Sequence, residues 1–98
     1  MDEKIRYAID DIEHVLVVHL RPSYLMVLGL EETPGEINII VSCAMFKGIT
    51  IQRRTAIVFS LLLSKINVTI VQDYLIVAQC FDGDEMLDYL DNCFEEIE

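Results

Sequence analysis

The chain has 98 residues, of which 53% are hydrophobic and 24% are charged. This length fits one domain over residues 1–98, and the composition excludes intrinsic disorder and collagen-like or low-complexity structure. Seventeen acidic residues against seven Lys and Arg give a formal net charge of −10, which argues against binding to nucleic acid or to an anionic membrane. The apolar content exceeds what a small core needs, so we expect some of it to lie at an interface with a protein.

The cysteines and the first residues predict a reduced, cytoplasmic protein. Cys43, Cys80 and Cys93 contain no C-x-x-C pair, whereas a small disulfide-rich secreted domain has an even and denser set of cysteines. Residues 1–4 (Met-Asp-Glu-Lys) do not resemble the basic start of a signal peptide. No apolar run approaches the roughly 20 residues that a membrane-spanning helix needs.

The first half of the chain is predicted to form one helix and three strands. Apolar positions at i, i+3, i+4 and i+7 indicate a helix over residues 2–13. The period then changes, and residues 15–20 (VLVVHL) form an apolar, β-branched run that is typical of a strand covered on both faces. Residues 24–30 and 37–46 are predicted as two further strands, each preceded by a turn signal. The short connections between them predict an antiparallel meander.

The second half is predicted to contain two helices with a hairpin between them. Thr50 is expected to cap a helix over residues 51–66. Residues 67–71 and 74–81 are predicted as strands joined by a two-residue turn. Asp82-Gly83-Asp84 ends the second strand and starts an amphipathic helix that runs to residue 97. The expected fold class is therefore α+β, an antiparallel sheet with helices in the order α-β-β-β-α-β-β-α.

The helix over residues 51–66 carries the predicted dimer interface. It is apolar around most of its circumference, and one face of a small sheet covers only about half of a helix. We therefore expect a homodimer, in which Leu62→Glu would give a soluble monomer. The residues expected at this interface are Ile51, Val58, Phe59, Leu62 and Ile66.

The acidic residues are concentrated near the C-terminus. Residues 82–98 contain eight acidic side chains and no Lys or Arg, whereas residues 33–81 contain two acidic and four basic side chains. An acidic helix face either keeps the protein soluble or binds a partner with a basic surface. The residues expected at such a docking face are Asp84, Asp88, Asp91 and Glu95.

No pattern reaches the specificity of a catalytic or metal-binding signature, so we expect no enzyme activity, no metal and no cofactor. His14 and His19 are five residues apart across a predicted helix–strand junction, a spacing that fixes no shared metal geometry. The three cysteines fall on predicted strands and on an apolar helix face, where packing is the expected role of a free cysteine. A glycine-rich phosphate loop and a twelve-residue calcium loop are both missing.

The order of elements resembles that of small type III secretion chaperones and of the related YbjN-like domains. The resemblance is carried by the leucine-rich helix over residues 51–66, the hairpin over 67–81 and the acidic amphipathic helix over 86–97. It implies a homodimer that binds protein segments without catalysis. The first functional hypothesis is thus a non-enzymatic protein-binding module of chaperone or adaptor type.

Residues 37–66 are also similar to a BolA-like domain. Residues 41–42 (Val-Ser), 46–48 (Phe-x-Gly) and 52–54 (Gln-Arg-Arg) are similar to the strand, the F-x-G turn and the basic helix start of that family. The resemblance implies a partner in iron–sulfur or redox assembly that works with a monothiol glutaredoxin. The family's Arg-His-Arg motif has no histidine here, and residues 67–81 contain no counterpart of the histidine that the family uses at an iron–sulfur site. A third hypothesis is a subunit of a larger complex without activity of its own.

Overall fold

The computed structural model describes residues 3–66 and 68–97, and these form a three-stranded sheet with helices. The α+β class predicted from the sequence is confirmed. The elements in chain order are α1 (Glu3–Leu20), β1 (Tyr24–Gly29), β2 (Glu36–Ser42), the 3-10 turn η1 (Ala44–Phe46), α2 (Ile51–Lys65), α3 (Val68–Asp73), β3 (Leu75–Phe81) and α4 (Gly83–Ile97).

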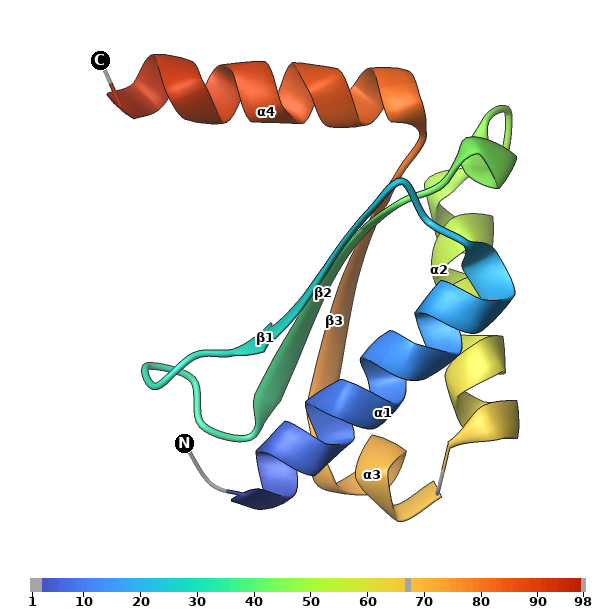
Figure 1. Cartoon of the computed structure of the whole chain (residues 1–98), viewed down its shortest axis with the longest axis vertical. Coiled ribbons are helices and arrows are strands. Elements are labelled where there is room, and N and C mark those ends of the chain that lie inside the picture. The colour runs from blue at the N-terminus through green and yellow to red at the C-terminus, as the bar shows by residue number, and fades with distance from the viewer. Residues whose placement is uncertain (1–2, 67, 98) are drawn as a thin grey trace.

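The sheet is mixed and is covered by helices on one face. Its strand order is β1-β2-β3, with β1 antiparallel and β3 parallel to β2. A parallel pair needs a crossover connection, and α2 and α3 supply it. Figure 1 shows α1, α2 and α3 on one side of the sheet, whereas α4 leaves the end of β3 and extends past the opposite side.

The two faces of the sheet differ in what covers them. Side chains alternate between the faces of a strand, and Ile37, Ile39 and Val41 of β2 point into the core beneath the helices. The other face, which we call the open face, carries Met26, Leu28, Asn38, Ile40, Val77 and Gln79. The largest fully buried side chains of the core are Phe46, Ile12, Leu16, Ile37, Ile39, Leu62, Val41, Val58, Cys43 and Ser42.

The first helix is longer than the sequence predicts. A strand is expected over residues 15–20, but these residues form the last part of α1. The buried side chains along the helix axis recur at intervals of four residues (Ala8, Ile12, Leu16, Leu20), so the apolar run continues the stripe of one helix. Val17 and Val18 are exposed, which a strand covered on both faces would not allow. The strand prediction is wrong because packing against the sheet outweighs the β propensity of the valines.

The segment after α2 also differs from the prediction. The expected hairpin of residues 67–71 and 74–81 is wrong, since residues 68–73 form α3 and β3 pairs with β2. Residue 67 lies outside the described residues. The expected antiparallel meander is accordingly reduced to the pair of β1 and β2. The physical reason is that α2 returns the chain to the end of the sheet where β2 begins, so β3 enters the sheet parallel to β2.

The starts of α2 and α4 agree with the prediction. The Thr50 hydroxyl oxygen accepts a hydrogen bond from the Arg53 N–H at 3.3 Å, as an N-cap does. At the start of α4, the Asp82 N–H donates to the Glu85 carboxylate and the Glu85 N–H donates to the Asp82 carboxylate, both at 2.8 Å. This reciprocal pair is a capping box. Within the described ranges, no helix combines the length and apolar character that a membrane crossing requires.

Candidate functional site

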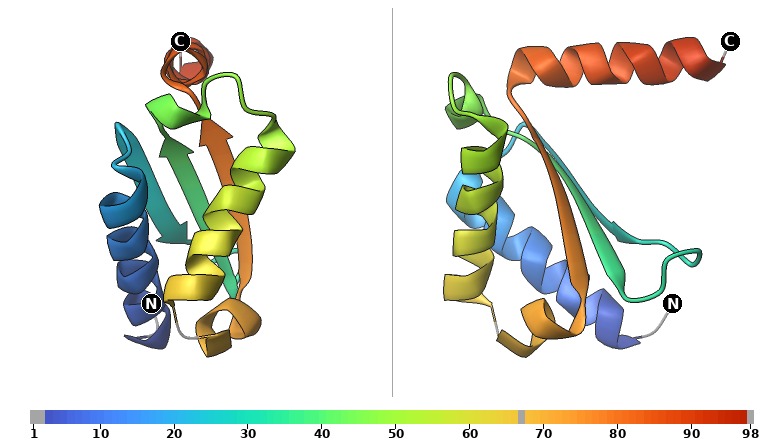
Figure 2. Two further views of the ribbon diagram at one scale, coloured as in Figure 1. Left: turned by 90° about the vertical axis from the view of Figure 1, so that its right-hand side faces the viewer. Right: turned by 180° about the vertical axis from the view of Figure 1, so that it is seen from behind.

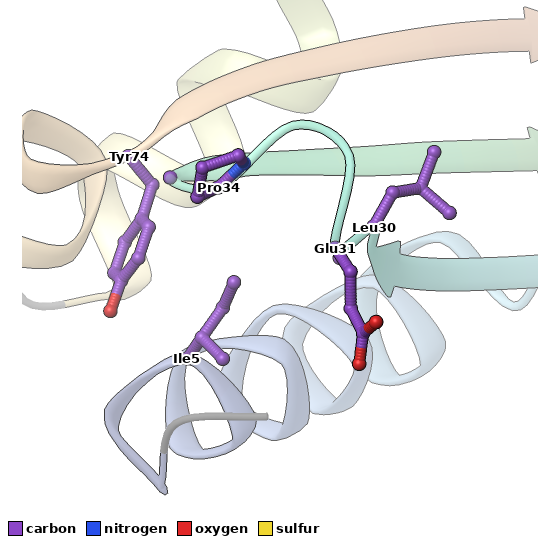
Figure 3. Close-up of a pocket in the computed structure, with 7 residues that line it drawn as sticks. Ile5, Leu30, Glu31, Pro34 and Tyr74 are labelled. Carbon is purple, nitrogen blue, oxygen red and sulfur yellow. The ribbon is translucent and has the colours of Figure 1, made fainter.

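A small pocket lies at the end of the sheet where β3 begins (Figure 3). It has a volume of about 230 Å³ and lies between the first turns of α1, the β1–β2 turn and the residue that precedes β3. Its apolar walls are Ile5, Leu30, Pro34 and Tyr74, and Glu31 is the charged side chain that lines it. Two glycines, Gly29 and Gly35, complete its lining.

The two glycines allow the walls of this pocket to approach one another. Gly29 packs closely against α1, since a Cβ at this position would lie 2.9 Å from Ile5 Cδ1. Gly35 has a φ of 84°, a left-handed conformation that favours glycine. The Gly35 carbonyl accepts a hydrogen bond from the Leu75 N–H at 2.9 Å, which holds the turn beside Tyr74. The backbone at Gly29 and Gly35 therefore determines how closely the walls of the pocket approach one another.

The size and lining of the pocket favour one kind of ligand. Pockets for drug-sized metabolites usually have volumes of about 300–1,000 Å³, so this one fits an apolar side chain better than a metabolite. Tyr74 is half-buried and offers an apolar ring with a polar hydroxyl, a combination that is frequent at protein interfaces. Glu31 and Glu32 are exposed in the adjacent turn, so the surroundings are acidic. The arrangement is suited to an apolar side chain of a partner protein with basic neighbours.

Arg54 forms a second polar feature, deep in the molecule. It belongs to α2 and is only 5% exposed. Its Nε donates to the Ile49 carbonyl at 2.7 Å, and its Nη1 donates to the Cys80 carbonyl at 3.2 Å and to the Glu85 carboxylate at 2.5 Å. The hydrogen bond from the Asp82 N–H, followed by that from Arg54, holds the pKa of Glu85 below its usual value. Arg54 thus connects α2, β3 and α4, and it serves the fold.

The described cysteines and histidines, Cys43, Cys80, His14 and His19, do not assemble a metal site. Burial raises the pKa of the Cys43 and Cys80 thiols, and the Cys43 thiol donates to the Leu20 carbonyl at 3.2 Å. His14 and His19 are exposed on α1. Among the residues described, no three His, Cys, Asp or Glu side chains are placed to hold a metal ion together. The side chain of Cys93 lies outside the described residues.

The structure corrects part of the predicted dimer interface. Val58 and Leu62 are fully buried and Ile66 is 9% exposed, so these three side chains belong to the core and cannot contact a partner. The reason is that α2 packs against both the sheet and α1, which runs beside it (Figure 2). Phe59 is half-buried against the core, and Ile51 is 66% exposed. An interface on α2 stays a prediction for its exposed side only.

The predicted acidic residues of the last helix are placed on α4. Asp84, Asp88 and Asp91 are exposed, and the side chain of Glu95 lies outside the described residues. Their role in docking stays a prediction. The pocket is not visible in the sequence, because Ile5, Pro34 and Tyr74 are far apart in the chain and come together only in the fold. The Pro34-Gly35 pair, which is typical of a turn, is the part of the pocket that the local sequence indicates.

Solved structures of other proteins share this fold. No family model matches the sequence, and neither does any curated protein. BolA1 from Arabidopsis thaliana superposes with a TM-score of 0.66 at 15% identity, over 80% of this chain and 94% of that chain. A bol-like protein from Babesia bovis gives 0.63 at 19% identity, over 83% and 91%. The BolA domain of SufE1 from Arabidopsis thaliana gives 0.62 at 15% identity, over 87% and 98%. The chain has a BolA-like fold.

The BolA-like fold supports one of the two resemblances in the sequence. It agrees with the similarity of residues 37–66 to a BolA-like domain. The resemblance to type III secretion chaperones and YbjN-like domains is not supported, because it depended on a hairpin over residues 67–81 that is a helix and a parallel strand. At identities of 15–19%, the likeness concerns the fold.

Proposed function

We propose that this chain is a non-enzymatic, BolA-like protein-binding domain that takes part in iron–sulfur or redox assembly in the cytoplasm. Its contribution is contact with a partner protein, and the proposal assigns no iron ligand to the residues that the structure describes. The observation that carries the proposal is the superposition on BolA-like structures over 91–98% of their length. Because a fold hosts more than one function, the side chains of this chain decide which part of that role it can perform.

The described cysteines do not fit an iron–sulfur cluster. Such clusters are held by thiolates or imidazoles that reach them. The thiols of Cys43 and Cys80 are buried and have raised pKa values, which disfavours the thiolate. The BolA-like resemblance implies a histidine within residues 67–81, and none is present there. Tyr74, the residue before β3, lines the pocket in this segment. The proposed role therefore does not include binding of a cluster by these cysteines.

The pocket is the surface that we assign to the partner. Its apolar walls take one side chain of the partner, and Tyr74 supplies a large and rigid contact area of the kind that dominates binding energies. Glu31 at the pocket selects a Lys or Arg beside that anchor. The proposed function is thus the docking of a partner protein, with this pocket as the anchor point.

The proposal is tested with a metal-free monothiol glutaredoxin as the partner, by calorimetry and gel filtration. We expect a one-to-one complex, weakened about tenfold or more by Tyr74→Ala and by Glu31→Lys, because hot-spot truncation and charge reversal remove the anchor contacts. Glu13→Lys, on the exposed surface of α1, is the matched control and should bind like the wild type. Urea unfolding of each variant checks that it is folded.

A second measurement addresses the iron–sulfur cluster. Adding this chain to a cluster-loaded glutaredoxin should leave the visible absorption spectrum of the cluster unchanged, because the chain exchanges no ligand. A spectral change that requires this chain would contradict the proposed role without ligands. Failure to form a complex in the micromolar range, with or without iron, would contradict the proposed function itself.

A further inference from the structure

The middle of the open face is largely apolar and carries no charged side chain, and Glu36 lies at its edge, where β2 begins. Its side chains form two rows across the strands, Met26–Ile40–Gln79 and Leu28–Asn38–Val77. Met26 and Val77 are 39% and 37% exposed. A hollow of about 230 Å³ lies on this face, lined among others by Leu28, Val77 and Tyr89. Antiparallel and mixed sheets that face water usually alternate apolar and polar side chains. Met26, Leu28, Ile40 and Val77 on the outer side of the strands therefore indicate that something packs on the middle of this face.

The α4 helix does not cover this face. Figures 1 and 2 show it standing away from the sheet at the end where β3 finishes. Its start is fixed by the capping box of Asp82 and Glu85, by the ion pair of Glu85 with Arg54, and by the packing of the Tyr89 ring 5.2 Å from the Phe81 ring. These contacts hold the first turns of α4 against β3 and α2, and Tyr89 is the α4 side chain that lines the hollow.

Acidic side chains border the open face at both ends. At one end, Asp84, Asp88 and Asp91 are exposed on α4, and at the other end Glu31 and Glu32 are exposed in the β1–β2 turn. The basic residues lie elsewhere, on α1, on α2 or in the segments that join these helices to their neighbours. They are Lys4, Arg6, Arg21, Lys47, Arg53, Arg54 and Lys65.

We infer that the open face binds an amphipathic helix of a partner protein, with an apolar stripe that packs on the strands and Lys or Arg side chains that reach the acids at both ends. An apolar helix stripe on an apolar sheet face is the ordinary way in which the two elements pack. The charges disfavour a second copy of this chain on the open face. Its α4 and its β1–β2 turn would place further acidic side chains beside the acidic side chains that already border the face. The open face adjoins the pocket at Leu30 and Glu31, but its two rows of side chains contain neither Tyr74 nor Ile5, so the inference goes beyond the proposed function.

The experiment uses two synthetic helical peptides and three variants of the full chain. Both peptides carry leucine on one face, and the flanking positions hold lysine in one peptide and glutamate in the other. Met26→Lys and Val77→Lys place a like charge on the open face. The matched control is Ile51→Lys, on the exposed side of α2 at 66% exposure. Because Met26 and Val77 point outward, both variants are expected to fold, and circular dichroism confirms this.

The expected result is that the leucine–lysine peptide binds the wild type and Ile51→Lys alike. Met26→Lys and Val77→Lys should each weaken binding about tenfold or more, and added salt should weaken it further. Amide chemical shift changes should then map to β1, β2 and β3. The leucine–glutamate peptide should not bind. If Val77→Lys fails to fold, Met26→Lys alone decides the result.

Three results would overturn the inference. The first is equal binding of the lysine and glutamate peptides, since it would remove the role of charge. The second is binding that Ile51→Lys abolishes and Met26→Lys leaves unchanged, because it would place the surface on α2. The third is a wild-type dimer that Val77→Lys dissociates, which would make a second copy the occupant. Loss of glutaredoxin binding by Tyr74→Ala with intact peptide binding would leave this inference standing.

Discussion

Arg54 is a buried charge whose guanidinium group hydrogen-bonds to β3, to α4 and to the loop before α2. Its partners are the carbonyls of Ile49 and Cys80 and the carboxylate of Glu85. Its guanidinium carbon also lies 6.0 Å from the centre of the Phe46 ring. A buried charge is strongly unfavourable unless hydrogen bonds and an opposite charge compensate it, and here both are present. Arg54, the second arginine of the Gln-Arg-Arg segment, is therefore part of the buried interior, whereas Arg53 is exposed.

Replacing Arg54 should destabilise the protein far more than replacing Arg53. In Arg54→Met, the carbonyls of Ile49 and Cys80 lose their donor and Glu85 loses its ion pair. We expect the free energy of unfolding to fall by about 2–4 kcal/mol. Arg53→Met should change it by less than about 0.5 kcal/mol. Urea unfolding measures both, and equal effects of the two substitutions would show that Arg54 is not buried as described.

The lowered pKa of Glu85 predicts how stability depends on pH. The folded-state pKa lies below the reference value of 4.5, so the folded state favours the ionised carboxylate. The stability that Glu85 contributes is present above about pH 4.5 and is lost as the pH falls through the folded-state pKa. Glu85→Gln should lower the stability at pH 7 and flatten its fall in acid. Arg54→Met should flatten it only in part, since the Asp82 N–H remains, and urea unfolding between pH 3 and 7 measures these curves.

The elements that the sequence predicts well are those whose signals are local. The helices that begin after Thr50 and at residue 83 have caps within a few residues of their starts, and the structure contains those caps. Residues 15–20 and 68–71 fall in predicted strands because valine, isoleucine and threonine favour strands. Their helical state depends on what packs against them, and a β-branched run of this length does not encode that.

The helical state of residues 15–20 can be tested at Val17, which is 49% exposed in α1. In an exposed helix position alanine is better than valine, so Val17→Ala should raise the free energy of unfolding by about 0.5 kcal/mol. The matched control is Val77→Ala in β3, at 37% exposure, which should lower it because alanine disfavours strands. Chemical denaturation measures both. A loss of stability in Val17→Ala would favour the strand.

The sites were less predictable than the elements, for a related reason. The residues of the α2 interface could not be divided into buried and exposed without knowing that α1 extends to Leu20 and packs beside α2. The pocket joins Ile5 to Pro34 and Tyr74 through the parallel entry of β3, which the predicted hairpin did not contain. The acidic residues of the last helix were identified because a charge run is visible in one dimension.

At the scale of the whole molecule, the predicted homodimer needs a different test from the one that the sequence offers. Leu62 is fully buried, so Leu62→Glu should unfold the chain instead of releasing a monomer. Leu63 is 56% exposed on the same helix, so a charge placed there would disrupt a dimer interface on α2 without entering the core. If α2 forms a homodimer, Leu63→Glu should remain folded and monomeric, as native mass spectrometry and sedimentation would show. A monomeric wild type would contradict the homodimer.

The parallel pairing of β2 and β3 also determines the order in which the sheet can form. β2 (Glu36–Ser42) can pair with β1 as soon as their short turn closes, but its other edge has no partner until α2 and α3 have returned the chain to its starting end. During synthesis, Ile37, Ile39 and Val41 therefore leave the ribosome long before the strand that covers their open edge. Non-local pairing of this kind is slow, and an apolar strand edge is prone to aggregation while it waits. The β3-facing edge of β2 is consequently the part of the sheet that stays unpaired longest while the chain is being made.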